Sequence, residues 1–324
     1  MENGGFEMIE VFGTDKKHAM KKLQDVQDGC WIKITSPTQT EIEDISNRFH
    51  IPKHYFHDAL DEEERSRIEL KRGDTDRSHS LVIVDCPYET IDEMGYTMYE
   101  TIPIGIILVE KVFITISLRE VPVLTSIIQK PLDTYDTSLH TRFLLQILYA
   151  VSYFYLNYLN KLIRLMNKLE GKIKQSMKNE QLYAFMAIQK SLVFFATALQ
   201  SNKAILDKMQ DVEHFMQNEA NHDLLRDVVI ENKQAIAMTD TYTQIISGMS
   251  DIFSSVISNN LNMVMKFLTS FTIILSLPTI VGSIYGMNVS LPFAHEAHAF
   301  SGIMIFTIIL TLIVTVIFWR KKYF

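Results

Sequence analysis

Two apolar spans in about the last sixty residues restrict what this chain can fold into more than any other feature. The first covers residues 267–287 and the second residues 301–319. Each is close to the roughly 20 apolar residues that an α-helix needs to cross the hydrocarbon core of a bilayer. Between Lys266 and Arg320 the only formally charged residue is Glu296. The sequence therefore predicts two C-terminal transmembrane helices.

The basic residues that flank these spans indicate how the helices are oriented. Lys266 precedes the first span, and Arg320, Lys321 and Lys322 follow the second. Basic residues favour the cytoplasmic side of a membrane. We therefore expect a multi-pass protein of the plasma (inner) membrane, surrounded by lipid, with both termini in the cytoplasm. Residues 1–13 lack a basic segment followed by an apolar stretch, so we expect no cleaved signal peptide.

The composition narrows the class of protein further. The chain has 324 residues, enough for about two domains, and its formal net charge of −7 argues against nucleic acid as a partner. Cys30 and Cys86 match no metal or disulfide spacing, so we expect both to be buried and reduced. No nucleotide-binding glycine loop and no catalytic triad are recognisable, so we expect neither an enzyme nor an organic cofactor.

The first part of the chain has the pattern of a mixed α/β domain. A helix is expected to start near Thr38 or Thr40, with Glu41 and Glu43 in its first turn. The acidic run at 61–64 is interpreted as the solvated start of another helix, not as a site. Segments rich in Ile, Val, Thr and aromatic residues predict strands at 8–12, 30–35, 67–70, 81–86, 98–108 and 112–118.

After a link at 131–137 the pattern becomes that of long helices. Apolar residues recur at spacings of three and four between Leu144 and Leu169, and a second helix is expected at about 180–216. A third helix should begin near Asp223 and continue past Leu277 into the first span, giving a rod of about 90 Å. The expected segments are an α/β domain (1–130), a helical stalk (138–266), a first transmembrane helix (267–287), an outer loop (288–300), a second transmembrane helix (301–319) and a basic cytoplasmic tail (320–324).

One face of the long helix carries hydroxyl groups at its outer end and apolar side chains at its inner end. The hydroxyls could line a wet lumen, or they could pack against neighbours and bond back to their own carbonyls, and the pattern does not decide between these. The apolar pair could form a gate by excluding water, or belong to a coiled-coil core. At about 100° per residue, the residues of this stripe are Met265, Leu268, Thr272, Ser276, Thr279 and Ser283, and Asn262 continues it farther down.

Several short motifs together resemble one known family. They are Ser-Asn-Asn-Leu-Asn at 258–262, Val-Met-Lys at 264–266, Leu268-Thr269, Pro278 and Tyr-Gly-Met-Asn at 285–288. A further stretch, Asp-Ala-Leu-Asp-Glu-Glu-Glu-Arg at 58–65, is similar to the N-terminal domain of the same family. On these residues the chain resembles the CorA family of divalent-cation channels over nearly its whole length.

The resemblance implies an α+β membrane protein that assembles as a funnel-shaped homopentamer. It implies Mg²⁺ influx, with Co²⁺ and Ni²⁺ also able to pass, so that Mg²⁺ is both substrate and regulatory ligand. Gly286, Met287 and Asn288 would form the outer mouth and selectivity filter. One Asn288 amide oxygen from each subunit would bind the outer waters of a hydrated ion, since Mg²⁺ releases water reluctantly.

The resemblance also assigns pore and regulatory positions. Four of the five pore positions that it implies, Met265, Leu268, Ser276 and Thr279, are already in the stripe, and the fifth is Asn262 farther down the same face. Asp251 matches a ring position in the stalk. Asp227 matches an acid that helps to bind regulatory Mg²⁺ between subunits and so holds the channel closed, although it could simply be a solvated helix acid. Its partner could be Glu89, Asp92 or Glu93, which are candidates only by charge.

The outer loop departs from the family pattern. It has a single acid, Glu296, and two histidines, His295 and His298, which suit Zn²⁺, Ni²⁺ or Co²⁺ better than Mg²⁺. One alternative is a Zn²⁺ transporter of the same superfamily, some members of which are thought to couple to protons. A second is a membrane-anchored scaffold or cation sensor without transport. The intact Tyr-Gly-Met-Asn motif favours Mg²⁺, and a mere anchor would not require the stripe that ends at Asn288.

Overall fold

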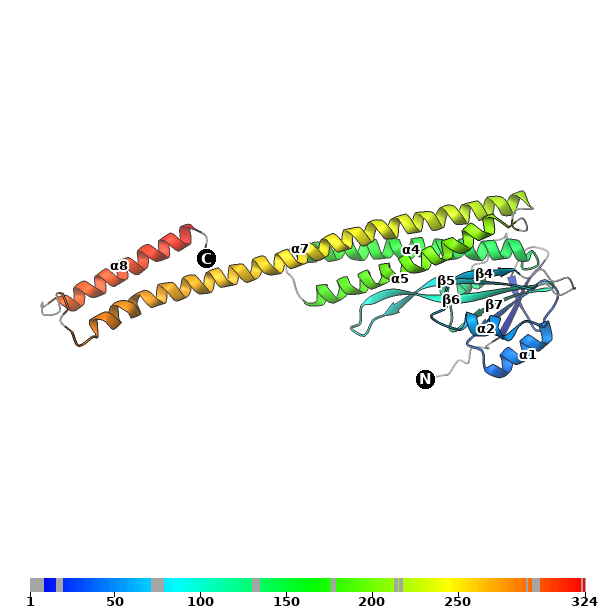
Figure 1. The fold of residues 1–324 in the computed structure, drawn as a ribbon, viewed down its shortest axis with the longest axis horizontal. Helices are drawn as coiled ribbons and strands as arrows, with labels where there is room; N and C mark the ends of the chain where they lie inside the picture. Colours follow the sequence, from blue (N-terminus) through cyan, green and yellow to red (C-terminus); the bar gives the residue numbers. More distant parts are fainter. Residues whose placement is uncertain are drawn as a thin grey trace. The chain divides into compact units, whose positions relative to one another are not determined.

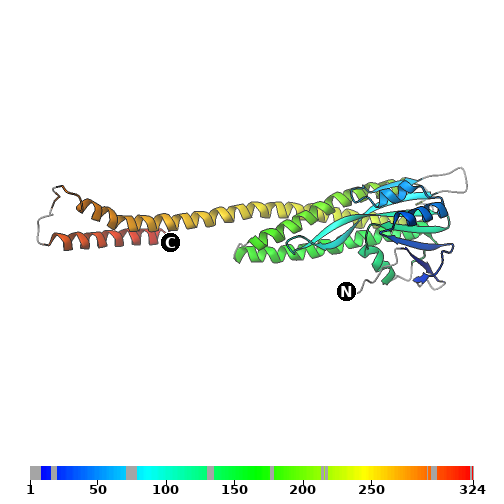
Figure 2. The same cartoon turned by 90° about the horizontal axis from the view of Figure 1, so that it is seen from below.

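The chain divides into two units, Met1–Ile245 and Ile246–Phe324, and one helix, α7 (Glu219–Tyr285), belongs to both. The N-terminal unit contains a sheet covered by helices, and the C-terminal unit is a helical hairpin (Figures 1 and 2). The structure is a computed structural model that describes residues 9–15, 20–70, 79–129, 135–175, 179–212, 215, 218–289, 291–292, 298–321 and 323.

A seven-stranded mixed sheet is the centre of the N-terminal unit. Its strand order is β2-β1-β3-β7-β6-β5-β4, in which β3 and β7 are parallel and every other neighbouring pair is antiparallel. The strands are β1 (Ile9–Thr14), β2 (Met20–Leu23), β3 (Cys30–Thr35), β4 (Arg67–Leu70), β5 (His79–Ile91), β6 (Thr97–Val109) and β7 (Val112–Ser117).

Helices α1 (Gln39–Phe49) and α2 (Lys53–Ala59) cover one face of the sheet (Figure 1). Side chains alternate along a strand, so Cys30, Ile32 and Ile34 of β3 all join the core beneath these helices. The Thr38 hydroxyl caps α1 while the Glu41 carboxylate accepts from the Thr38 backbone N–H, which satisfies donors that the helix start leaves free. This capping box fixes where α1 begins.

The opposite face carries α4 (His140–Gln175) and α5 (Asn179–Gln210). Helix α3 (Pro122–Gln129) packs against α4, and the first part of α7 packs on the helical layer (Figure 1). Trp31 of β3 packs edge-on against Phe143 of α4, with ring centroids 5.3 Å apart. Tyr155 of α4 packs against Phe195 of α5 at 5.0 Å. Burial of these large rings supplies much of the force that holds the helical layer to the sheet.

One helix of this layer is apolar enough to span a membrane by length and composition, yet it packs on the sheet. Three helices meet that criterion: Asn179–Gln210, Glu219–Tyr285 and Ala299–Arg320. In α5 the apolar window is 44% buried inside the chain, against 6% in α7 and in α8. Because α5 already buries one face against β5 and β6, its hydropathy reflects the protein core, and α7 and α8 are the membrane candidates.

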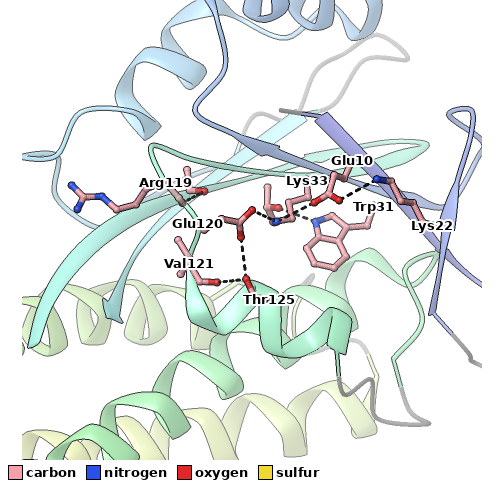
Figure 3. A network of polar contacts seen from close by, with 10 residues as sticks. Glu10, Lys22, Trp31, Lys33, Arg119, Glu120, Val121 and Thr125 are labelled. Carbon is pink, nitrogen blue, oxygen red and sulfur yellow. Dashed lines mark hydrogen bonds and ion pairs between the residues drawn. The ribbon is translucent and has the colours of Figure 1, made fainter. Parts of the chain in front are cut away.

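A buried lysine joins three parts of the N-terminal unit (Figure 3). The Lys33 side chain on β3 is only 4% exposed, and its ammonium lies 3.2 Å from a Glu10 carboxylate oxygen and 2.6 Å from one of Glu120. Glu120 also accepts a hydrogen bond from the Thr125 hydroxyl at 3.0 Å. A buried charge is tolerated only when it is paired. The network therefore fixes β1, β3 and the start of α3 against one another.

The C-terminal unit is formed by the end of α7 and by α8 (Ala299–Arg320), which turns back and runs beside it (Figures 1 and 2). Pro278 lies inside α7 without ending it. On α8, Thr307, Thr311 and Thr315 each donate to the carbonyl four residues earlier at 2.8 Å. Such bonds satisfy hydroxyl donors in a segment that has no water to bond.

The structure confirms most of the elements expected from the sequence and corrects two. The strands at 30–35 and 67–70 and the single helix through Asp223 and Leu277 are as predicted. Strand β2 was not predicted. The acidic run 61–64 follows the end of α2 instead of starting a helix, and Arg67 binds Asp58, Glu64 and Glu69 around it. Both cysteines are buried and free, as expected.

The segment boundary expected at 131–137 lies inside the N-terminal unit, since α4 and α5 pack on the sheet that precedes the link. Residues 131–134 themselves lie outside the described residues. The division between the two compact units falls within α7, after Ile245.

A close approach between α2 and the sheet requires glycine at one position of β6. A Cβ atom added at Gly105 would collide with Ala59 Cβ and lie 2.8 Å from Ile116 Cγ2. We expect Gly105→Ala to lower the free energy of unfolding by about 1–3 kcal/mol, the usual effect of overpacking a core. The control is Gly171→Ala on α4, where an added Cβ meets nothing within 4 Å. Thermal unfolding of both variants checks this, and an unchanged midpoint for Gly105→Ala would contradict it.

A second buried network surrounds Asp85 on β5. Its carboxylate accepts from the Ser66 hydroxyl at 2.7 Å, and its backbone carbonyl accepts from Asn202 of α5 at 2.9 Å and from the Tyr155 hydroxyl at 3.0 Å. Burial raises the pKa of the Asp85 carboxyl to about 6, although the bond from Ser66 opposes the shift. At neutral pH the folded protein therefore holds a carboxylate where it is poorly solvated.

Because the pKa of Asp85 is raised, one substitution should increase the free energy of unfolding by an amount that depends on pH. Between the unfolded pKa of 3.8 and the folded pKa of about 6, the folded state binds the proton more tightly, so the contribution of Asp85 to stability is lost as pH rises through 6. Asp85→Asn removes the charge and keeps an acceptor for Ser66, so it should raise the free energy of unfolding at pH 7.5 by up to about 3 kcal/mol. The gain over wild type should shrink at pH 5. Melting curves at both pH values test this, and an equal difference at both would contradict it.

Candidate functional site

The motif at 285–288 lies where α7 ends. Tyr285 is the last helical residue, and Gly286 and Met287 close the final turn by donating to the carbonyls of Gly282 and Ile284 at 3.0 and 3.2 Å. Asn288 follows in the turn and is exposed. Carbonyl oxygens at a helix C-terminus carry partial negative charge. An amide side chain beside them gives a site that favours a cation or its hydration shell.

The side of α7 that faces α8 is identified by its burial. Ser270 is 1% exposed, and Ile274, Leu277 and Val281 are half-buried at spacings of four, three and four residues. Thr307 is the buried residue of α8, at 7% exposure. At about 100° per residue these positions form one face of α7, and the centre of the hydroxyl stripe lies roughly 180° from it. Most of the stripe is therefore on the face that α8 leaves uncovered, although Ser276 is half-buried.

The hydroxyls of the stripe bond to their own helix. Thr272, Ser276 and Thr279 donate to the carbonyls of Leu268, Ile273 and Leu275 at 2.8, 2.9 and 3.1 Å. This is the backward bonding that the packing interpretation expects. It also leaves the oxygen lone pairs pointing away from the donated proton as acceptors, since a hydroxyl has two. The same geometry therefore suits either a packed interface or a lumen that accepts hydrogen bonds from the waters around a cation.

The apolar end of the stripe is exposed in the single chain. Met265 and Leu268 are 52% and 53% exposed, and Asn262 is exposed one turn earlier. Apolar Met and Leu side chains on an uncovered helix face can pack against the same side chains of other copies. An apolar ring at this level requires further copies of the chain.

The two acids singled out from the sequence lie in different units. Asp227 is exposed on the first part of α7. It lies near Tyr149, whose pKa is raised mainly by burial and further by the charges of Glu231 and Asp227. Asp251 is exposed in the C-terminal unit. Among the described residues, no group of three or more His, Cys, Asp or Glu side chains could hold a metal ion. Neither acid therefore belongs to a site formed by the described part of one chain.

The candidate partners of Asp227 lie on the β5–β6 hairpin, and two have roles there already. Glu89 pairs with Lys161 of α4 at 3.0 Å. The Asp92 carboxylate accepts from the backbone N–H groups of Met94 and Tyr96 at 3.0 and 2.8 Å, which shapes the turn between the strands. Glu93 is exposed in the same turn.

Of the outer-loop candidates, only His298 can be described. It occupies the N-cap position of α8, and its side chain forms no capping hydrogen bond. His295 and Glu296 lie outside the described residues. The structure therefore neither brings the two histidines together nor separates them.

Comparison with known proteins identifies the family. The model of the CorA-like Mg²⁺ transporter protein family matches residues 26–322. The chain belongs to the CorA family. The cobalt/magnesium transport protein CorA of Methanocaldococcus jannaschii is 26% identical over 298 residues, which cover 90% of each chain.

Solved structures of the family and its relatives have the same fold. The complete structure of the CorA magnesium transporter from Methanocaldococcus jannaschii matches with a TM-score of 0.78 at 23% identity, covering 98% of this chain and 99% of that one. The cytoplasmic domain of ZntB from Vibrio parahaemolyticus matches more distantly, with a TM-score of 0.56 at 13% identity, covering 77% of this chain and 98% of that one. The CorA fold therefore extends through both units.

The structure adds one feature of the CorA hairpin that the sequence did not reveal. Ser270 was only an exception among apolar residues in the sequence, whereas it is the most buried position of α7 between residues 267 and 285. Small hydroxyl residues on both helices, Ser270 and Thr307, allow close packing in a membrane. Their positions along each helix could be read from the sequence, but the sequence does not say which residues of the two helices face each other.

The two faces of α7 should differ in access to water. We expect Thr279→Cys to react readily with a small charged thiol reagent and Val281→Cys, on the half-buried side toward α8, to react at least about tenfold more slowly, because a charged reagent avoids hydrocarbon. Cys30 and Cys86 are 1% and 0% exposed, so the wild-type background should be low. Labelling rates in membranes test this. Equal rates at both positions would contradict a wet stripe.

Proposed function

We propose that this CorA-family chain is a Mg²⁺ and Co²⁺ transporter that works as a passive influx channel, with Ni²⁺ also able to pass. The observation that carries the proposal is the stripe on the uncovered face of α7, which ends at Gly286, Met287 and Asn288. The choice of ions is supported by the relative from Methanocaldococcus jannaschii, which is named a cobalt/magnesium transport protein.

The ion path is formed by several copies of the chain. Two helices cannot enclose water, so the uncovered face of α7 must meet the same face of other subunits around an axis. We assign a homopentamer from the family resemblance. The basic residues Lys266 and Arg320, which flank the two spans on one side, support cytoplasmic termini. We assign the protein to the plasma membrane.

Selection takes place at the outer mouth. The Asn288 amides of the subunits bind the waters of a hydrated ion, while Gly286 keeps the neighbouring backbone free of side chains. Below the mouth, Ser283, Thr279, Ser276 and Thr272 offer hydroxyl oxygens to the same waters. This arrangement suits Mg²⁺, which is slow to lose its hydration shell and prefers oxygen ligands.

The gate lies at the inner end of the stripe. Rings of Met265 and Leu268 around a narrow lumen exclude water and close the path, and Asn262 lies on the cytoplasmic side of these rings. Internal Mg²⁺ stabilises the closed state by bridging acids between subunits, with Asp227 and Asp251 as ligands. When internal Mg²⁺ falls, the acids repel one another and the rings separate.

A Zn²⁺ transporter coupled to protons is the second candidate. Two observations favour it: the loop histidines, of which His298 precedes α8 without a capping bond, and the fold shared with the ZntB cytoplasmic domain. Imidazole is a better ligand for Zn²⁺ than for Mg²⁺. A membrane-anchored sensor without transport is a weaker candidate function, because an anchor does not require an amide side chain at the end of a hydroxyl stripe.

The filter assignment is tested by Mg²⁺ uptake into liposomes that contain the purified protein, driven by an inside-negative voltage. We expect Asn288→Ala to lower the initial rate at least about tenfold, because each subunit loses a bond to the hydrated ion. Asn259→Ala is the matched control, since Asn259 is exposed on the opposite side of α7 from the stripe. Equal uptake by Asn288→Ala and wild type would remove Asn288 from the filter.

A further inference from the structure

A cavity of about 450 Å³ lies in the N-terminal unit, apart from every position assigned to the ion path. It is lined by residues from β4, β6, the segment leading into α4, and the first turns of α4 and α7, including Leu70, His140, Arg142 and Asn221. Its volume is in the range of about 300–1,000 Å³ typical of small-molecule sites. Both helices begin at the same end of the unit (Figure 1).

Two buried polar atoms in the lining residues have no partner. His140 Nε2 and Asn221 Oδ1 are inaccessible to solvent and form no hydrogen bond within the structure. Buried polar atoms are nearly always satisfied, because an unpaired one loses its hydration without a replacement. Both atoms are closed to water, so a ligand reaches them only when the two side chains turn toward the cavity; two such atoms among the residues that line one cavity then favour a bound molecule that supplies the missing donors.

The protonation state of His140 identifies the kind of group that its Nε2 atom can bind. Burial lowers the pKa of this imidazole, and its ring accounts for one hydrogen bond, to the Val109 backbone carbonyl. Since Nε2 is the atom without a partner, Nδ1–H donates that bond and Nε2 of the neutral ring is an acceptor. Asn221 Oδ1 is also an acceptor. The ligand must therefore carry N–H or O–H donors.

The charge of the cavity indicates an anion. Arg142 is only partly exposed, and within the described part of the chain it forms no ion pair. The first turns of α4 and α7 add the positive ends of two long helices. Glu110, the acid of the lining, is exposed and would repel an anion near it, which favours the Arg142 side. Guanidinium groups pair with phosphate through two parallel hydrogen bonds.

The remaining wall is apolar. Leu70, Leu139 and Phe215 line the cavity together with aliphatic residues of β6. A bare phosphate ion would leave this surface and both acceptors unused. A nucleoside monophosphate combines a phosphate, amino and hydroxyl donors, and a flat ring that can lie on apolar side chains.

We propose that this cavity binds a nucleoside monophosphate, with its phosphate on Arg142 and its amino or hydroxyl donors on His140 Nε2 and Asn221 Oδ1. The site gives the N-terminal unit a ligand distinct from the divalent cations of the ion path. Nothing in this assignment depends on which ion the hairpin carries.

Calorimetric titration of the full-length protein in detergent with AMP tests this proposal. A chelator is present throughout, so that divalent cations cannot contribute. We expect saturable binding that Arg142→Gln and Asn221→Ala each weaken at least about tenfold, the usual effect of losing a charged or buried hydrogen bond. Arg164→Gln is the matched control, since Arg164 is exposed farther along α4. It should bind AMP as wild type does.

Two additions keep the result decisive. Asn221→Ala removes an unsatisfied atom, so the unliganded variant should melt no lower than wild type, which separates lost binding from lost folding. Inorganic phosphate and adenosine, each titrated alone, should bind more weakly than AMP. The proposal is overturned if AMP does not bind, if both cavity variants bind it as wild type does, or if phosphate alone binds as tightly as AMP.

Discussion

The C-terminal hairpin covers very little of its own surface, and the assembly of the protein depends on this. Among the described residues, the buried or half-buried positions of α7 between residues 267 and 285 are Ser270, Ile274, Ser276, Leu277 and Val281, and Thr307 is the one buried residue of α8. In hydrocarbon, polar groups must be satisfied by the protein itself. The Ser and Thr hydroxyls manage this with carbonyls of their own helix. An Asn amide has two donors and one acceptor and cannot do so alone, so Asn288 must meet water or other subunits.

The N-terminal unit also satisfies its buried polar groups within the protein, but through contacts between different helices and strands. Its buried charges and polar groups are satisfied across elements that are far apart in sequence, as Lys33 is by Glu10 and Glu120, and Asn202 by the backbone of Asp85. These networks join sheet and helices into one body. The unpartnered atoms of His140 and Asn221 differ from the other unpartnered buried polar atoms among the described residues because both residues line the same cavity. Each unit therefore lacks contacts that another molecule would supply: further copies of the chain at the hairpin, and a small ligand at the cavity.

The sequence predicted best where local chemistry alone decides the structure. The strand at 30–35 is bounded by turn residues, α1 begins at a capping box, and no helix breaker interrupts α7 before Pro278, so each could be located without tertiary information. Strand β2, Met-Lys-Lys-Leu, was missed because an edge strand with two lysines has no β-branched residue to mark it. The acidic run at 61–64 was assigned to the wrong end of a helix, since one of the groups that pair with it, Arg119 with Glu62, is brought to it only by the fold. The cavity at Arg142 could not have been predicted, because β4, β6, α4 and α7 meet there from distant parts of the sequence.

Passive conduction of a hydrated ion is the central claim, and the competing account is Zn²⁺ transport coupled to protons. The most direct test is uptake of Mg²⁺ and of Zn²⁺ by wild-type protein in the same liposomes, measured with an inside-negative voltage and no pH gradient, and again with a proton gradient and no voltage. A hydrated-ion channel predicts rapid Mg²⁺ uptake that follows the voltage and does not respond to the proton gradient. Zn²⁺ uptake that requires the proton gradient, with no Mg²⁺ uptake under voltage, would contradict it.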